Sequence, residues 1–353
     1  VAYNMAWTAY WWYEDYQEFN TLYKRVEELA IDSYQASDFE LLSNLWQLLC
    51  TAINSGVLKK EEGKLGERTK TIKRELVRVS ENTQRPNNAL YAKSLILLIE
   101  LSQKLSKHKN VDSILQDLNN ILESGTGHAE YPITPIIQII QELGELLTDN
   151  SNYDELLESV IRVMEQRARE AETGKILLIR GQQMLSTGKK YEAIKLLGRA
   201  QQKLAMEEHN EEWIMAAATC GLAYEGVGLL WAARTNLLAA TSLVFSKYAK
   251  QGELPPHTLL LAQKLVWIEL QLGRIPHILA SMEYVSLIAS YLMLEEDLLK
   301  KFVEERRMQD AVLGILLLRA DIPTLKWLDF LPPVLEQFNM TSSWMALLYA
   351  LGY

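Results

Sequence analysis

The same pattern occurs twice, 40 residues apart, in GQQMLSTGKKYEAIKLLGRA (residues 181–200) and in GLAYEGVGLLWAARTNLLAA (residues 221–240). Each copy opens on a glycine and has a second glycine seven positions later, where a helix can end. At offsets +3, +12, +16 and +19 the copies carry Met184 and Tyr224, Ala193 and Ala233, Leu197 and Leu237, and Ala200 and Ala240. Small residues let two helices approach closely, so the pattern predicts a repeated helical hairpin.

The pattern extends in both directions with looser spacing. Gly144 lies 37 residues before Gly181, and Leu156 follows it at +12, where the two clear copies carry Ala. Further on, Ile275-Pro276 and Ile322-Pro323 lie 47 residues apart, and proline in the first turn of a helix loses no hydrogen bond. Both prolines therefore predict the start of a return helix, and the clearest repeats span about 136–285.

This spacing resembles the tetratricopeptide repeat, in which Gly or Ala is followed by an aromatic residue at +3 and by Ala at +12 and +19. The resemblance implies a right-handed α-solenoid of about seven or eight antiparallel hairpins, formed by residues 1–353 as a single array. Periods of 37 to 47 residues exceed the family's usual 34, which implies longer helices or loops. Helical periodicity throughout, with only 17 Gly and 9 Pro, predicts an all-α fold.

Composition restricts the class of protein. The formal net charge of −9 argues against general nucleic-acid binding, which needs a basic surface. The two cysteines, Cys50 and Cys220, lie 170 residues apart and predict buried thiols of a reducing compartment. No apolar run reaches the 18 or so residues of a membrane-spanning helix, and no signal peptide is visible. We therefore expect a cytoplasmic protein without membrane segments.

Two local clusters have more than one interpretation. Nine aromatic residues fall within positions 3–23, and they fit either the packing of two antiparallel helices or a platform on which a ligand stacks. Residues 59–78 are the only basic cluster, with eight basic and four acidic side chains. They fit either a solvated helix face with charge pairs or a local contact for an anion or nucleic acid.

The ends of the chain suggest a segment of a larger protein. The chain opens at Val1 inside a helical pattern without an initiator Met, and it closes at Gly352-Tyr353 soon after an apolar run. After Pro332-Pro333 the periodicity predicts one last helix over residues 334–353.

No catalytic or metal-binding motif is present in the sequence. The five histidines have no His or Cys partner at metal-ligand spacing, and the run Glu207-Glu208-His209-Asn210-Glu211-Glu212 is typical of a polar loop. Thr173-Gly174-Lys175 lacks the upstream glycine of a phosphate-binding loop. We expect neither enzymatic activity nor a cofactor or metal in these residues.

The resemblance also implies where a partner would bind. In tetratricopeptide repeats the first helix of each hairpin lines the concave surface, at offsets −6, −3, +1 and +4 from the small residue. Carried onto Gly144, Gly181, Gly221 and Val266, these offsets define what we call the stripe. Its polar and aromatic members are the binding candidates: Gln138, Gln141, Glu145, Lys175, Gln182, Glu225, Gln263 and Trp267. Its apolar members include Met215, Ala218, Leu222 and Leu260.

The sequence leaves three functions open. The first is a scaffold whose concave face binds a protein or peptide, with Trp267 as the expected main contact. The second is the sensor domain of a larger signal-transducing (STAND-type) nucleotide hydrolase, such as a bacterial transcription activator or a defence protein; a nucleotide-binding motif in the flanking sequence would indicate it. The third is an all-helical enzyme, which would need acidic and aromatic residues around one cavity.

Overall fold

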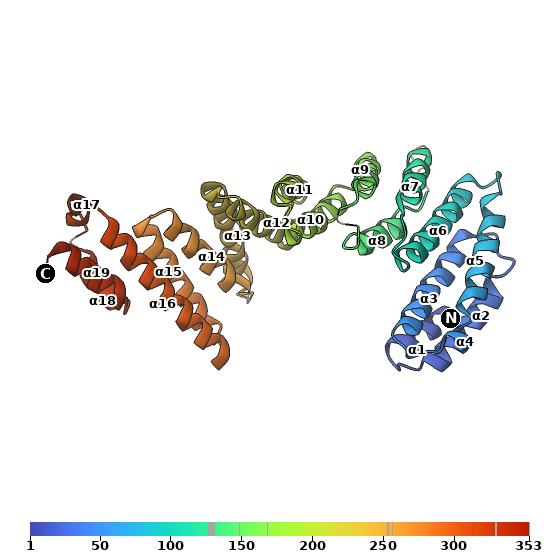
Figure 1. Cartoon of the computed structure of the whole chain (residues 1–353), viewed down its shortest axis with the longest axis horizontal. Helices are drawn as coiled ribbons and strands as arrows, with labels where there is room; N and C mark the ends of the chain where they lie inside the picture. Colours follow the sequence, from blue (N-terminus) through green and yellow to red (C-terminus); the bar gives the residue numbers. More distant parts are fainter. Residues whose placement is uncertain are drawn as a thin grey trace. The chain divides into compact units, whose positions relative to one another are not determined.

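The computed structural model describes residues 1–125, 131–147, 149–167, 169–252, 254–255, 257–328 and 330–352, except the side chains of residues 134, 135, 138, 139, 142 and 322. The described residues form helices joined by turns and contain no strand (Figure 1). The predicted all-α class is confirmed. The chain divides into two compact units, unit 1 (Val1–Arg169) and unit 2 (Glu170–Tyr353).

Unit 1 holds the first nine α-helices. They are α1 (Ala2–Trp11), α2 (Tyr16–Ala30), α3 (Ala36–Asn54), α4 (Lys60–Gly63), α5 (Leu65–Ser80), α6 (Pro86–Leu105), α7 (Asp112–Gly125), α8 (Thr134–Leu143) and α9 (Ser151–Gln166). Helix α3 packs against α1, α2 and α5, and further contacts join α5 to α6, α6 to α7 and α7 to α9. The apolar face of α3, with Phe39, Leu45 and Leu49 fully buried, forms the centre of this packing.

Unit 2 holds α10 (Glu170–Ser186), α11 (Lys190–Lys203), the 3-10 turn η1 (Glu207–His209), α12 (Asn210–Gly226), α13 (Leu230–Gln251), α14 (His257–Gln271), α15 (Ile275–Tyr291), α16 (Glu296–Arg319), α17 (Ile322–Lys326), α18 (Leu331–Gln337) and α19 (Thr341–Leu351). Three regular hairpins, α10–α11, α12–α13 and α14–α15, follow one another, and the second helix of each of the first two packs against the first helix of the next. This stacking is the arrangement of an α-solenoid.

The repeat register is visible in the contacts of the two glycines. A Cβ added at Gly181 would lie 2.6 Å from Cγ of Leu197, and one added at Gly221 would lie 2.9 Å from Cγ of Leu237. Glycine and leucine at +16 thus face each other in both hairpins, where the alanines at +12 and +19 are also fully buried. The sequence pattern therefore marks the line along which the two helices of each hairpin meet.

The turn of each hairpin also depends on glycine. Gly188 and Gly228 occupy equivalent places after α10 and α12, with φ of +83° and +79°. This left-handed conformation costs little only for a residue without Cβ, so glycine ends both helices as predicted. The prolines at 276 and 323 stand in the first turns of α15 and α17, as expected.

The prediction of one last helix over 334–353 is wrong. Helix α18 ends at Gln337, Asn339 adopts φ of +56°, and α19 begins at Thr341. The break is stabilised from α16, because the buried carboxylate of Asp310 accepts hydrogen bonds from the backbone N–H groups of Ser342 (2.9 Å) and Ser343 (3.0 Å). It satisfies donors that a helix N-terminus leaves unpaired.

The remaining predictions about the array as a whole stay predictions. These are its right-handed sense, the number of seven or eight hairpins, and the single solenoid over 1–353. None of the helices in the described part of the chain combines the length and apolar character that spanning a bilayer requires.

Candidate functional site

A groove opens in unit 2 between α12 and α14, and we call it the α12–α14 groove. Its volume is about 580 Å³. Its lining comprises Glu211, Ile214, Met215, Ala218, Thr219 and Leu222 of α12; Leu237, Val244 and Lys247 of α13; Pro255, His257, Leu260, Leu261, Gln263 and Lys264; and Glu305 of α16. Five of these residues, Met215, Ala218, Leu222, Leu260 and Gln263, are stripe positions.

The groove exposes apolar side chains that a folded chain ordinarily buries. Met215 is 46% exposed, Leu222 is 37% exposed and Leu260 is 64% exposed, although all three line one concave surface. Below them Ile214, Leu237 and Val244 are buried and belong to the packed interior. A concave surface with exposed apolar side chains above a well-packed interior is typical of a site that binds another molecule.

Helix α13 is longer than the second helix of the preceding hairpin, and its C-terminal part lines the groove. Helix α10 packs directly on α12, and α14 packs directly on α16. Helix α13 has 22 residues whereas α11 has 14, and Val244 and Lys247 near its C-terminal end line the groove. The sequence carries a trace of this, since the motif position at Val266 follows Gly221 by 45 residues rather than 40.

Ion pairs hold the lysines that line the groove. Lys247 pairs with Glu211 across the α12–α13 hairpin. Lys264 on α14 lies 3.9 Å from Glu225 on α12, and Glu225 also accepts a hydrogen bond from Gln271 at 3.4 Å. The two contacts to Glu225 join α12 to α14 at one end of the groove.

Glu305 of α16 has a different environment. Its two carboxylate oxygens accept hydrogen bonds from Gln263 Nε2 at 2.6 Å and from Trp267 Nε1 at 2.8 Å. Sequence reasoning missed Glu305, which lies 38 residues after Trp267 and therefore about one repeat further along. The spacing of about one repeat was the feature of the sequence that could have pointed to Glu305 as a neighbour of Trp267.

Several predicted site residues of unit 2 have partners within the chain. Lys175 on α10 pairs with Glu212 at 2.7 Å, and this hydrogen bond lowers the pKa of the Glu212 carboxyl below its usual range. Gln263 is buried, and Trp267 packs partly against the apolar core of α14 to α19. Lys175, Gln263 and Trp267 thus make contacts within the chain, and their role as binding residues stays a prediction. Gln182 is half-buried on α10.

The predicted residues of unit 1 do not share one helix face. Gln141 is half-buried near the end of α8. Helix α8 ends at Leu143, so Glu145 lies in the turn that follows it and is exposed. Gly144 thus comes after its helix, whereas Gly181 and Gly221 lie inside theirs. The offsets carried onto Gly144 therefore extend past the helix. The side chain of Gln138 lies outside the described residues.

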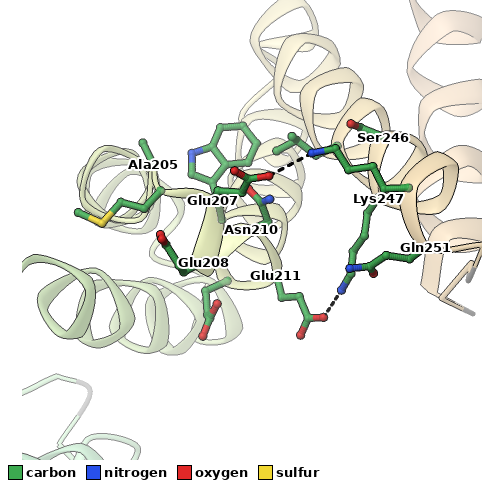
Figure 2. Close-up of a pocket in the computed structure, with 13 residues that line it drawn as sticks. Ala205, Glu207, Glu208, Asn210, Glu211, Ser246, Lys247 and Gln251 are labelled. Carbon is green, nitrogen blue, oxygen red and sulfur yellow. Dashed lines mark hydrogen bonds and ion pairs between the residues drawn. The ribbon is translucent and has the colours of Figure 1, made fainter.

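A second, open hollow of about 820 Å³ lies over the acidic run at 207–212 (Figure 2). Lys250 Nζ lies 3.1 Å from Glu207, and Lys247 pairs with Glu211. In the described part of the chain, no group of three His, Cys, Asp or Glu side chains is arranged to hold a metal ion. The run predicted as a polar loop instead forms η1 and the first turn of α12, and two ion pairs join it to α13.

Half of the eight basic residues at 59–78, namely Arg68, Lys73, Arg74 and Arg78, make contacts inside unit 1. Lys73 pairs with Glu100 at 2.5 Å, and Arg78 pairs with the buried Glu75 at 3.0 Å. Arg68 is itself buried, with its guanidinium carbon 4.1 Å from the centre of the Tyr23 ring. These contacts favour the structural interpretation of the cluster over a nucleic-acid contact.

The N-terminal aromatic residues divide between core and surface. Tyr10 packs edge-on against Phe19, with ring centres 5.2 Å apart, and Phe19 and Tyr23 are fully buried. Trp12 and Tyr13, by contrast, are 80% and 76% exposed. The packing interpretation holds for Tyr10, Phe19 and Tyr23. The ligand-stacking interpretation stays open for Trp12 and Tyr13.

The two thiols are poor nucleophiles. Burial raises the pKa of Cys50 to about 12 and that of Cys220 to about 11. Since the thiolate is the reactive form, neither side chain is poised for nucleophilic chemistry at neutral pH.

Comparison with known proteins gives little further information. No family model matches the chain, and no curated protein matches it at a significant level. Among solved structures it is similar to a circular tandem repeat protein with a novel repeat topology and enhanced subunit contact surfaces. The two are 14% identical with a TM-score of 0.38, and the similarity covers 99% of this chain and 93% of the other.

Proposed function

We propose that this chain is a non-catalytic recognition protein and that it binds a segment of a protein partner in the α12–α14 groove. The observation that carries the proposal is the convergence of three exposed apolar side chains, Met215, Leu222 and Leu260, on one concave surface from two different helices. Their contact with water is unfavourable, so covering them with partner side chains would stabilise a complex.

The size and rim of the groove suit a peptide. Its volume of about 580 Å³ falls within the range of roughly 300–1,000 Å³ that binding pockets occupy. Helix-in-groove recognition places apolar side chains of a partner segment in such a groove and leaves its polar face toward the rim. The non-catalytic part of the proposal is supported by the ion-paired lysines of the groove and the protonated thiols.

The proposal predicts that peptides selected on the protein bind through Leu260. Random 12-residue peptides displayed on phage are selected against the full 353-residue chain, and the affinity of the enriched peptides is measured by calorimetry. Because loss of a central contact commonly costs about 2 kcal/mol or more, Leu260→Asp should weaken binding at least about tenfold.

The matched control is Leu287→Asp on α15. Leu287 is 61% exposed, close to the 64% of Leu260, and it does not line the groove. The control variant should bind the enriched peptides within about twofold of the wild-type affinity, as expected for an energetically neutral site. Equal binding to wild type and Leu260→Asp, or no enrichment of any peptide, would contradict the proposed function.

A further inference from the structure

The groove lining carries two carboxylates, Glu211 and Glu305, and two lysines, Lys247 and Lys264, but their ion pairing is uneven. Lys247 and Lys264 each have a carboxylate partner, in Glu211 and Glu225 respectively. Glu305 accepts hydrogen bonds only from the neutral groups of Gln263 and Trp267, and no Lys, Arg or His nitrogen of the described residues lies within ion-pair distance of it. Within the described part of the chain, Glu305 is therefore the lining carboxylate that has no cationic partner.

The position of this carboxylate is fixed in advance. Each of its oxygens accepts one hydrogen bond from α14, at 2.6 Å and 2.8 Å, so the side chain has little freedom. Both donors are neutral, and a carboxylate has about four acceptor sites, so it can accept further hydrogen bonds. A half-buried carboxylate held beside apolar walls attracts a cation, and a partner that covers the groove would exclude water and strengthen the interaction.

We propose that the partner segment carries an arginine or lysine next to its apolar side chains, and that this cation pairs with Glu305. The inference rests on the proposed function, because it specifies the chemistry of the segment that the same groove binds. Apolar side chains cover Met215, Leu222 and Leu260, while the cationic group reaches the α16 end of the groove and hydrogen-bonds the free lone pairs of Glu305. Pairing by charge gives the site its specificity among apolar segments.

The test is a double-mutant cycle with the peptides enriched by phage selection. We expect the enriched sequences to share a basic residue. Replacing that residue by Gln in a synthetic peptide should weaken binding to the wild-type chain about tenfold or more, as expected for a close charge pair. On Glu305→Gln the same peptide change should weaken binding less than about twofold, because the charge it pairs with is already absent.

Glu304→Gln provides the matched control. Glu304 is the exposed neighbour on the same helix and does not line the groove, so this variant changes the net charge by the same amount. It should retain the full effect of the peptide substitution. An equal loss on Glu305→Gln and on wild type, or enriched peptides without a basic residue, would overturn the inference. If those peptides still lose affinity on Leu260→Asp, the proposed function stands and only the assignment of Glu305 fails.

Discussion

Replacing Glu269 by Ala is expected to lower the free energy of unfolding by about 3–5 kcal/mol, because it leaves two largely buried guanidinium groups without their shared partner. Glu269 lies on α14 and is 1% exposed. Its Oε1 is 2.6 Å from Arg234 Nε on α13, and its Oε2 is 3.4 Å from Arg274 Nη1 in the turn before α15. The carboxylate thus joins two successive hairpins, and both guanidinium groups also lie near the Trp231 ring.

The measurement is urea unfolding followed by circular dichroism, with Glu283→Ala as the control. Glu283 is exposed on α15 in the same unit, so its removal should change the free energy of unfolding by less than about 0.5 kcal/mol. A midpoint for Glu269→Ala equal to that of the control would show that the carboxylate does not join the hairpins.

The second large effect concerns the helix contact that the repeat pattern marks. Gly181→Ala should lower the free energy of unfolding by about 1–3 kcal/mol, the usual cost of overpacking. The added Cβ would lie 2.6 Å from Cγ and 2.8 Å from Cδ2 of Leu197, so the two helices of the hairpin would have to separate.

Gly198→Ala is the matched control within the same hairpin. Gly198 also lies inside a helix, and a Cβ added there meets no atom within 4 Å. Because alanine favours a helix over glycine, this change should raise the free energy of unfolding by up to about 1 kcal/mol. Opposite signs for the two substitutions would confirm the register, whereas a stabilising Gly181→Ala would refute it.

The fold could be predicted where small residues repeat. Gly181 and Gly221 can serve only a close helix contact in that pattern, so the hairpins around them follow from the sequence alone. The register around Gly144 could not be transferred, because this glycine ends α8 instead of lying within it. The break between α18 and α19 carries no Pro or Gly of its own and depends on Asp310, a residue on a different helix.

The groove was only partly predictable. Five stripe positions on α12 and α14 line the groove, but the sequence analysis favoured the polar members of the stripe as binding residues over Met215, Leu222 and Leu260. Which side chains stay exposed depends on how α12, α13, α14 and α16 pack around the groove, and the repeat pattern does not carry this information. No described residue bears on the sensor-domain alternative or on the all-helical enzyme, and both stay predictions.

The most direct measurement of the central claim is photo-crosslinking of an enriched peptide to the full chain. One apolar residue of the peptide is replaced by photo-leucine, and the crosslinked residues are identified by mass spectrometry. The account predicts crosslinks to α12 and α14 at Met215, Leu222 and Leu260, with their loss when unlabelled peptide competes. Competed crosslinks confined to other surfaces, such as the exposed aromatic residues Trp12 and Tyr13 or the outer face of α15, would contradict it.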